Sequence, residues 1–149
     1  MSYETILFDV DGGIATIVLN RPKALNALNP QMGEEFVDAA IRCRADPAVR
    51  AVIVKGAGRA FCAGGDVKAF AEFLQGDPLV AFRNLATRLH AGIIEIRRME
   101  KPVIAQVHGF AIGAGMSLAL ACDLTIAAET AQFIMAYARV GLSPDGGST

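Results

Sequence analysis

The sequence predicts an α/β protein, because strand-like and helix-like segments alternate along it. The run AVIVKG at residues 51–56 is short, β-branched and free of alternation, which is typical of a strand covered on both faces in a parallel sheet. Between Pro78 and Met99, apolar residues recur at every third or fourth position, as an amphipathic helix requires. No repeat or low-complexity segment divides the 149 residues, so we expect one domain over residues 1–149.

A β-hairpin and a helix are predicted at the start of the chain. The runs TILFDV and IATIVLN flank an Asp-Gly-Gly sequence at residues 11–13, and Asp-Gly between apolar runs is a strong hairpin signal. Asn29 and Pro30 then offer an N-cap and a first helical residue. The helix should run from Pro30 to about Arg44, shortly before Pro47.

The second half of the chain predicts further strands and another helix. PVIAQV at residues 102–107 is a strand candidate, GFAIGAG a turn, and MSLALAC a helix too apolar to face water. DLTIAAE and AQFIMA are two more short strand candidates. In α/β proteins of this kind, ligands tend to bind at the carboxyl ends of the strands.

The segment from Pro102 to Cys122 has 21 residues and no charge, which is long enough to raise the question of a membrane span. Polar residues and three glycines interrupt it, and basic residues flank it on one side only. We therefore expect core elements here. The N-terminus has acidic residues and lacks the basic and apolar regions of a secretory signal, so we expect a cytoplasmic protein.

Charge and cysteine content exclude several other classes. Fourteen basic and fifteen acidic side chains give a net charge of -1, which does not favour a general nucleic-acid partner. Cys43, Cys62 and Cys122 are odd in number and far apart, which favours reduced thiols in the core over disulfides or a zinc site.

Two glycine-dense turns follow predicted strands, at residues 63–66 (AGGD) and 112–115 (IGAG). Glycine lets the backbone approach a ligand closely, and a helix N-terminus leaves N–H groups unpaired. Two such donors aimed at one oxygen would form an oxyanion hole, which indicates enolate or acyl chemistry. The turns lack the sequence of a phosphate-binding P-loop or dinucleotide motif. The alternative is that these glycines only permit tight packing between strand and helix.

Three ordered segments together resemble the enoyl-CoA hydratase/isomerase family, the crotonase superfamily. NRPKALNAL resembles the family's early segment near the CoA adenine, and RAFCAGGDVKAF resembles its first oxyanion loop. KPVIAQVHGFAIGAGMSLALACDLTIAAETAQF resembles the second loop with its helix and following strands. The resemblance implies a crotonase-like spiral of ββα units and acyl-CoA thioester substrates. It also implies no metal or redox cofactor, and homo-oligomers of three or six subunits.

The resemblance also implies site residues. The oxyanion donors would be the N–H groups of Gly65 and Ala114, the latter standing where the family often has glycine. A backbone donor tolerates alanine if its φ is negative. The residues implied to contact the substrate are Lys23, Ala24, Ala63, Gly64, Gly65 and Asp66.

The chain departs from the family's hydratases at their two catalytic glutamates, where it has Ser117 and Tyr137. Water addition needs one group to activate water and another to protonate Cα, so the usual hydratase mechanism lacks its carboxylates. Asp145 falls where some family isomerases, and a dehalogenase branch, have a catalytic aspartate. One carboxylate suffices to shift a double bond, so an enoyl-CoA isomerase is the leading hypothesis.

Several of these residues also have structural interpretations. Pro-Asp-Gly-Gly is turn chemistry, so Asp145 is equally explained as a turn or N-cap residue. Asp66 is explained better as the N-cap of a helix beginning VKAF than as a substrate ligand. Lys23 and Lys68 would meet CoA phosphates or simply be solvated. His90 and His108 resemble packing or loop residues rather than ligands.

Two other functions stay open beside isomerisation: an enoyl-CoA hydratase with an unfamiliar arrangement, and a non-catalytic acyl-CoA binder or assembly subunit. The resemblance covers only the N-terminal part of the family's length. It therefore implies that the C-terminal helical region of the family is absent from this chain, which ends at Thr149.

Overall fold

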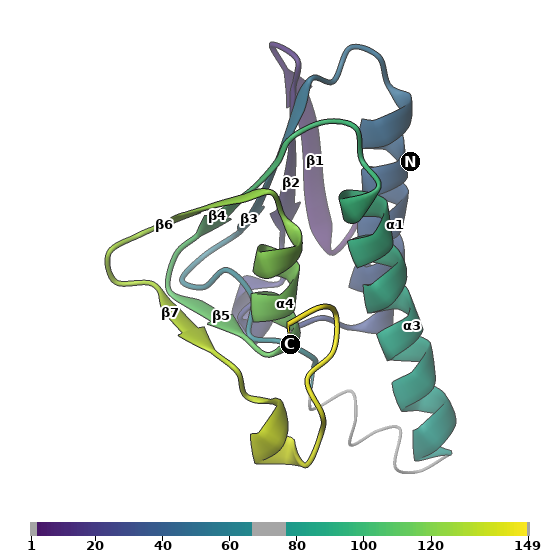
Figure 1. The fold of residues 1–149 in the computed structure, drawn as a ribbon, viewed down its shortest axis with the longest axis vertical. Coiled ribbons are helices and arrows are strands. Elements are labelled where there is room, and N and C mark those ends of the chain that lie inside the picture. Colours follow the sequence, from purple (N-terminus) through teal and green to yellow (C-terminus); the bar gives the residue numbers. More distant parts are fainter. Residues whose placement is uncertain (1–2, 67–76, 149) are drawn as a thin grey trace.

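The main sheet of the computed structural model, which describes residues 3–66 and 77–148, has five strands in the order β1-β2-β3-β4-β6 (Figure 1). The strands are β1 (Ile6–Asp11), β2 (Ile14–Leu19), β3 (Ala51–Gly56), β4 (Val103–Val107) and β6 (Leu124–Ala127). A second sheet pairs β5 (Phe110–Ile112) with β7 (Gln132–Ile134) in parallel. These strands alternate with helices, which confirms the predicted α/β class.

Strand pairing follows the sequence patterns. β1 and β2 are antiparallel and the pair Asp11↔Ile14 closes a two-residue turn of Gly12 and Gly13, so the predicted hairpin is confirmed. β3 lies between β2 and β4 and is parallel to both. Its Val52 and Val54 side chains are buried, as expected for a strand inside a parallel sheet.

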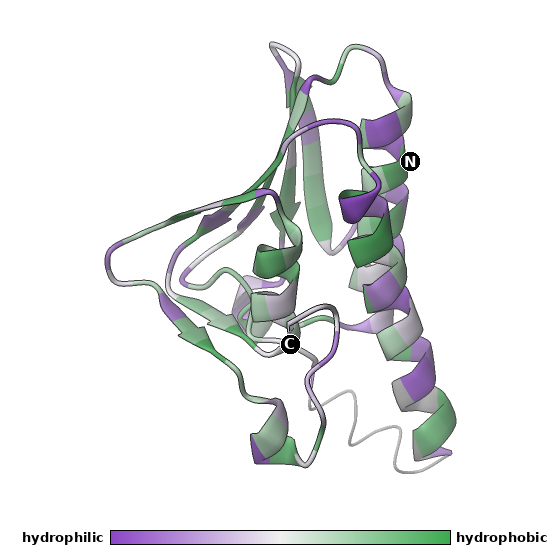
Figure 2. Ribbon diagram, viewed as in Figure 1, coloured by the Kyte–Doolittle hydropathy of each residue, from purple (hydrophilic) through white to green (hydrophobic). Residues whose placement is uncertain are grey.

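Three helices complete the described fold: α1 (Pro30–Ala45), α3 (Pro78–Arg97) and α4 (Ala114–Ala121). α1 begins as predicted, because the Asn29 side chain accepts a hydrogen bond from the Met32 N–H at 2.9 Å. α1 and α3 run side by side along one side of the sheet (Figure 1). Both helices carry a mixture of hydrophobic and hydrophilic residues along their length (Figure 2), as expected of helices that cover a core on one side and face solvent on the other. The helix predicted to begin VKAF lies outside the described residues.

The uncharged segment from Pro102 to Cys122 is one ββα unit, in which β4 belongs to the large sheet, β5 to the small sheet, and α4 packs against β5 and the later strand β6. Two details of its prediction were wrong. GFAIGAG contains β5, because that strand finds partners far away in sequence, and α4 begins at Ala114 rather than Met116. α4 is mostly buried, although Leu120 is half exposed. Across the described residues, no helix has the length and hydropathy of a membrane span.

Candidate active site

The two glycine-dense turns lie against each other, although some 50 residues separate them in sequence. The Cys62 N–H donates to the Phe110 carbonyl at 3.0 Å, and the Ile112 N–H donates to the Cys62 carbonyl at 2.9 Å. Gly64 has φ +93, and a Cβ built there would lie 2.8 Å from the Ile112 carbonyl oxygen. At Gly115, an added Cβ would collide with the Cys62 carbonyl. The glycines therefore do serve tight packing, and that packing brings both turns to one place.

The same packing leaves two backbone donors without partners. Within residues 3–66 and 77–148, neither the Gly65 N–H nor the Ala114 N–H meets a hydrogen-bond acceptor. Ala114 is the first residue of α4, where N–H groups have no acceptor inside the helix. Among the described non-glycine residues only Leu25 and Asn26 have positive φ, so alanine fits at position 114 without strain.

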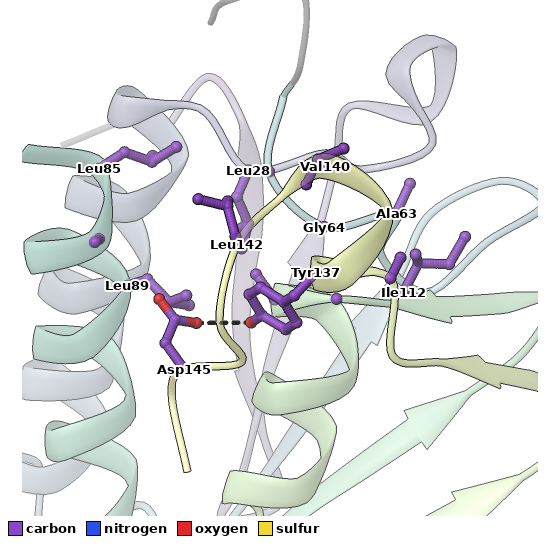
Figure 3. A pocket seen from close by; sticks show the side chains of 15 residues that line it. Leu28, Ala63, Gly64, Leu85, Leu89, Ile112, Tyr137, Val140, Leu142 and Asp145 are labelled. Atoms are coloured by element: carbon purple, nitrogen blue, oxygen red, sulfur yellow. Dashed lines mark hydrogen bonds between the residues drawn. The ribbon is translucent and has the colours of Figure 1, made fainter. Parts of the chain in front are cut away.

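Both turns line a pocket that α3 and the C-terminal segment close from the other side (Figure 3). Tyr137 and Asp145 carry the polar side-chain groups among its described lining residues. The described lining is Leu28, Ala63, Gly64, Gly65, Leu85, Ala86, Leu89, Ile112, Gly113, Ala114, Ala136, Tyr137, Val140, Leu142 and Asp145. A charge that develops in such an apolar pocket interacts strongly with nearby donors, because little water screens it.

The two polar side chains of the pocket contact each other and Ser117. The Tyr137 hydroxyl donates to Asp145 Oδ1 at 2.7 Å and lies 2.8 Å from Ser117 Oγ. Since Tyr137 gives its single proton to the carboxylate, it can only accept from Ser117. Burial raises the pKa of Tyr137 well above its usual range; the bond from Ser117 opposes this shift and the bond to Asp145 adds to it. Tyr137 therefore stays protonated and remains a donor to Asp145.

Asp145 is also a turn residue, as its sequence context suggested. Its carbonyl accepts from the Ser148 N–H at 3.2 Å and from Ser148 Oγ at 2.7 Å. Ser117 Oγ lies 3.0 Å from the same carbonyl. The turn fixes the backbone of Asp145 and Tyr137 orients its carboxylate, so the two interpretations of this residue are compatible.

Comparisons with known proteins agree with this geometry. The model of the enoyl-CoA hydratase/isomerase family matches residues 9–149. The chain belongs to this family. A protein named probable enoyl-CoA hydratase from Rhodobacter capsulatus is 42% identical over 100% of the chain and 56% of its own length. The 1,2-epoxyphenylacetyl-CoA isomerase of Escherichia coli is 37% identical over 98% of the chain and 56% of its own length.

Solved structures show the same fold. The crystal structure of an enoyl-CoA hydratase from Polaromonas sp. JS666 superimposes with a TM-score of 0.89 at 41% identity, over 95% of this chain and 55% of that one. The predicted crotonase-like fold is thus confirmed for the described residues. The chain spans little more than half the length of these relatives.

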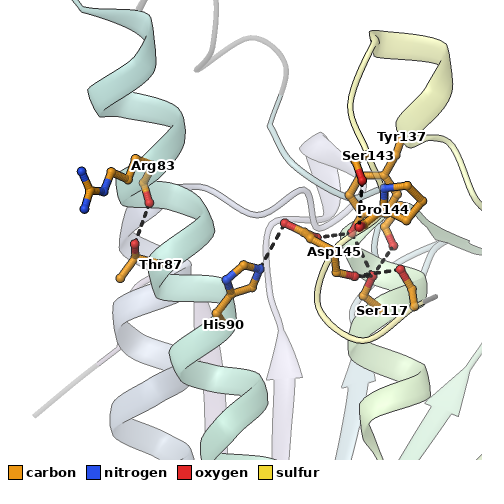
Figure 4. A network of polar contacts seen from close by, with 10 residues as sticks. Arg83, Thr87, His90, Ser117, Tyr137, Ser143, Pro144 and Asp145 are labelled. Atoms are coloured by element: carbon orange, nitrogen blue, oxygen red, sulfur yellow. Dashed lines mark hydrogen bonds and ion pairs between the residues drawn. The ribbon is translucent and has the colours of Figure 1, made fainter.

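One residue of this family member was misjudged from sequence. His90 Nε2 lies 3.2 Å from Asp145 Oδ2, 55 residues away in sequence, so His90 is not simply a packing residue (Figure 4). The sequence held no local signal for this contact; in the structure, Ala86, one turn earlier on α3, lines the pocket. His108 is a loop residue, as expected, with Nε2 at 2.8 Å from the Gly58 carbonyl.

Half of the residues implied to contact the substrate lie outside the described pocket lining, namely Lys23, Ala24 and Asp66. Lys23 and Ala24 belong to η1 (Pro22–Ala24), where Lys23 is exposed. Asp66 forms an ion pair with Arg21 at 2.9 Å, and Arg21 lies just before η1. Ala63, Gly64 and Gly65 do line the pocket. Lys68 lies outside the described residues.

Asn26 joins the η1 region to the first turn and was not singled out from sequence. Its buried side-chain nitrogen lies 2.8 Å from the carbonyl oxygens of both Ala57 and Ala60, and its side-chain oxygen accepts from the Arg21 N–H at 2.9 Å. Asn26 thereby holds the loop that leads from β3 to Gly65. An Asn in a segment of turn formers was the signal available in the sequence, and in the structure it has a positive φ.

The cysteines of the chain are buried thiols. All three cysteines are free and buried, as predicted. Burial raises the pKa of the Cys62 thiol to about 12, which keeps it protonated and unreactive. Among the described residues, no group of three or more His, Cys, Asp or Glu side chains is arranged to hold a metal.

Proposed function

We propose that this chain carries the catalytic groups of an enoyl-CoA isomerase, with Asp145 as the acid/base and the Gly65 and Ala114 N–H groups as the oxyanion hole. The observation that carries the proposal is the pocket itself. One oriented carboxylate and two unpartnered backbone donors belong to residues that line the same apolar space. This is the set of groups that a proton shift next to a thioester requires.

The reaction would proceed in two proton transfers. Asp145 takes a proton from Cα of a 3-enoyl thioester, and the electron pair moves to the thioester oxygen. The two N–H groups stabilise that oxyanion, each by about 3 kcal/mol in comparable sites. Asp145 then returns a proton to C4, which leaves the double bond between Cα and Cβ. Nothing is oxidised or reduced, so the reaction as written needs no redox cofactor.

The remaining expectations belong to the same proposal. The substrate would be an acyl-CoA thioester, whose CoA part would run past Lys23, Ala24 and Asp66. The protein would act in the cytoplasm as a homo-oligomer of three or six subunits. The substrate, its CoA contacts and the oligomeric state rest on the family resemblance, and the cytoplasmic location is the expectation from the N-terminal sequence.

Hydration is the second candidate, since relatives such as that from Rhodobacter capsulatus are named hydratases. It would require the Tyr137 hydroxyl and Asp145 to hold and activate water together. We rank it lower because Tyr137 already gives its proton to Asp145, which leaves one carboxylate for two tasks. A non-catalytic acyl-CoA binder ranks third.

The test follows the absorbance of the conjugated 2-enoyl thioester after mixing the purified protein with a 3-enoyl-CoA. We expect a rising signal that falls at least about 100-fold in Asp145→Asn, because a general acid/base is lost. Asp38→Asn is the matched control: its carboxylate also accepts from a tyrosine, Tyr3 at 2.6 Å, but lies away from the pocket.

Each other outcome points elsewhere. Unchanged turnover in Asp145→Asn would remove Asp145 from the mechanism. Loss of conjugated absorbance from a 2-enoyl-CoA, with no reaction of the 3-enoyl isomer, would favour the hydratase. CoA-thioester binding without any reaction would favour the binder.

A further inference from the structure

We infer that His90 is a positioning residue that connects Asp145 to solvent, so that the transferred proton exchanges with water during isomerisation. The inference rests on the proposed role of Asp145. It is supported by a separate observation: one oxygen of this carboxylate contacts a buried side chain, and the other contacts a partly exposed one.

The partner of Oδ1, Tyr137, is buried in the protein. Asp145 Oδ1 accepts from Tyr137, whose hydroxyl lies against Ser117 Oγ, and Ser117 is fully buried on α4. Tyr137 is itself 8% exposed. This side of the carboxylate is therefore the more buried one.

The partner of Oδ2, His90, is partly exposed to solvent. Asp145 Oδ2 lies 3.2 Å from His90 Nε2, and the His90 side chain is 45% exposed against 33% for Asp145. Asp145 lines the pocket and His90 does not, although Ala86 and Leu89 of the same helix do. Figure 4 shows the imidazole extending from α3 toward the carboxylate. An acyl group in the pocket would cover Asp145 and leave His90 at the solvent side.

The exchange step conserves atoms and charge. After Asp145 has taken the Cα proton, its neutral carboxyl group passes a proton to Nε2 of the neutral imidazole. The imidazolium then exchanges this Nε2 proton for one from water at its partly exposed side. Nε2 passes the solvent proton back to Asp145, which delivers it to C4. The product therefore carries a solvent hydrogen instead of the original one.

The experiment measures solvent hydrogen in the product. The protein converts a 3-enoyl-CoA in D2O, and mass spectrometry at low conversion gives the deuterium incorporated per turnover. We expect substantial incorporation by the unmodified protein and at least about threefold less in His90→Gln, which can still donate to Asp145 but cannot relay a proton. His90→Asn is the second variant in case the first folds poorly. His108→Gln is the matched control and should incorporate as much as the unmodified protein.

Several results would overturn the inference. These are equal incorporation in His90→Gln and the unmodified protein, full retention of the original hydrogen by the unmodified protein, and a loss of turnover in His90→Gln without changed incorporation. The last would mean that His90 only holds the carboxylate. Failure of the proposed function looks different: the unmodified protein would not isomerise, or Asp145→Asn would remain active, and the inference would then fall with it.

Discussion

The pocket has two sides that are built in different ways. The turn side, residues 63–65 and 112–115, offers backbone N–H groups, and backbone hydrogen bonds through Cys62 hold it together. The network side comprises His90, Ser117, Tyr137 and Asp145, whose side chains come from α3, α4 and the C-terminal segment. The first side presents peptide groups that every residue possesses. The second depends on four particular functional groups, of which Tyr137 and Asp145 line the pocket.

Substitutions on the two sides should therefore lower the activity for different reasons. On the turn side, side-chain identity matters only through the space that a Cβ needs and the φ that it allows. On the network side, the backbone is already fixed by a turn, and loss of one hydroxyl or carboxylate should lower the activity with little change in the fold. Substitutions that add or remove a few atoms can separate these two kinds of failure.

The largest effect is expected from Gly64→Ala on the turn side. An added Cβ would meet the Ile112 carbonyl oxygen at 2.8 Å, at a φ of +93 that alanine disfavours. The loop must shift, and the Gly65 N–H shifts with it. Because loss of one oxyanion donor typically costs about 100-fold or more in kcat, we expect a loss of that order. Steady-state kinetics on a 3-enoyl-CoA would measure it.

Gly12→Ala is the control for the conformational part of this effect. Gly12 also has positive φ, at +55, but an added Cβ there meets no atom within 4 Å. It should lower the thermal stability somewhat and leave kcat unchanged. If Gly64→Ala kept full activity, the turn side would be more tolerant than its packing indicates.

A smaller effect is expected from Tyr137→Phe on the network side. The substitution removes the donor to Asp145 Oδ1 and preserves the ring. A hydrogen bond to a charged group contributes about 1.5–3 kcal/mol, so kcat should fall about tenfold or more. Tyr3→Phe is the matched control, because Tyr3 donates to Asp38 in the same manner away from the pocket. Equal activity of Tyr137→Phe and the unmodified protein would show that the turn alone orients Asp145.

The contrast also explains what could be predicted from the sequence. The hairpin, β3, α1 and α3 follow from local patterns, since their periodicity and end signals lie within each segment. β5 was missed, because its three residues gain strand structure only from distant partners in β7 and at Cys62. Local patterns do not contain such pairings.

For the site, glycine density and the family resemblance were enough to select the turn side. Ser117, Tyr137 and Asp145 were singled out one by one, but their hydrogen-bonded contact depends on how α4 meets the C-terminal segment. His90 was misjudged for the same reason, since its partner is 55 residues away. The catalytic roles of all these residues remain predictions.

The smallest expected effect concerns the chemical labelling of Cys62. The backbone of this residue forms the hydrogen bonds that join the two turns. Burial raises the pKa of this thiol to about 12, so at pH 8 the native protein presents almost no thiolate to an alkylating reagent. Cys62 should therefore be labelled only when the turns separate. Mass spectrometry of the labelled peptide would give its rate, which should equal that of global unfolding in the unmodified protein.

The two variants above should change this labelling rate differently. Gly64→Ala should accelerate it, because the added Cβ forces the Cys62 segment away from β5. Tyr137→Phe should not, because its lost bond lies on the network side. The free energy of unfolding should also depend on pH. The pKa of Cys62 in the folded protein exceeds the ordinary thiol value near 8.5, so this thiol ionises first in the unfolded chain. The stability therefore falls as the pH rises from there toward about 12. Equal acceleration by both variants would mean that the two sides open together as one unit.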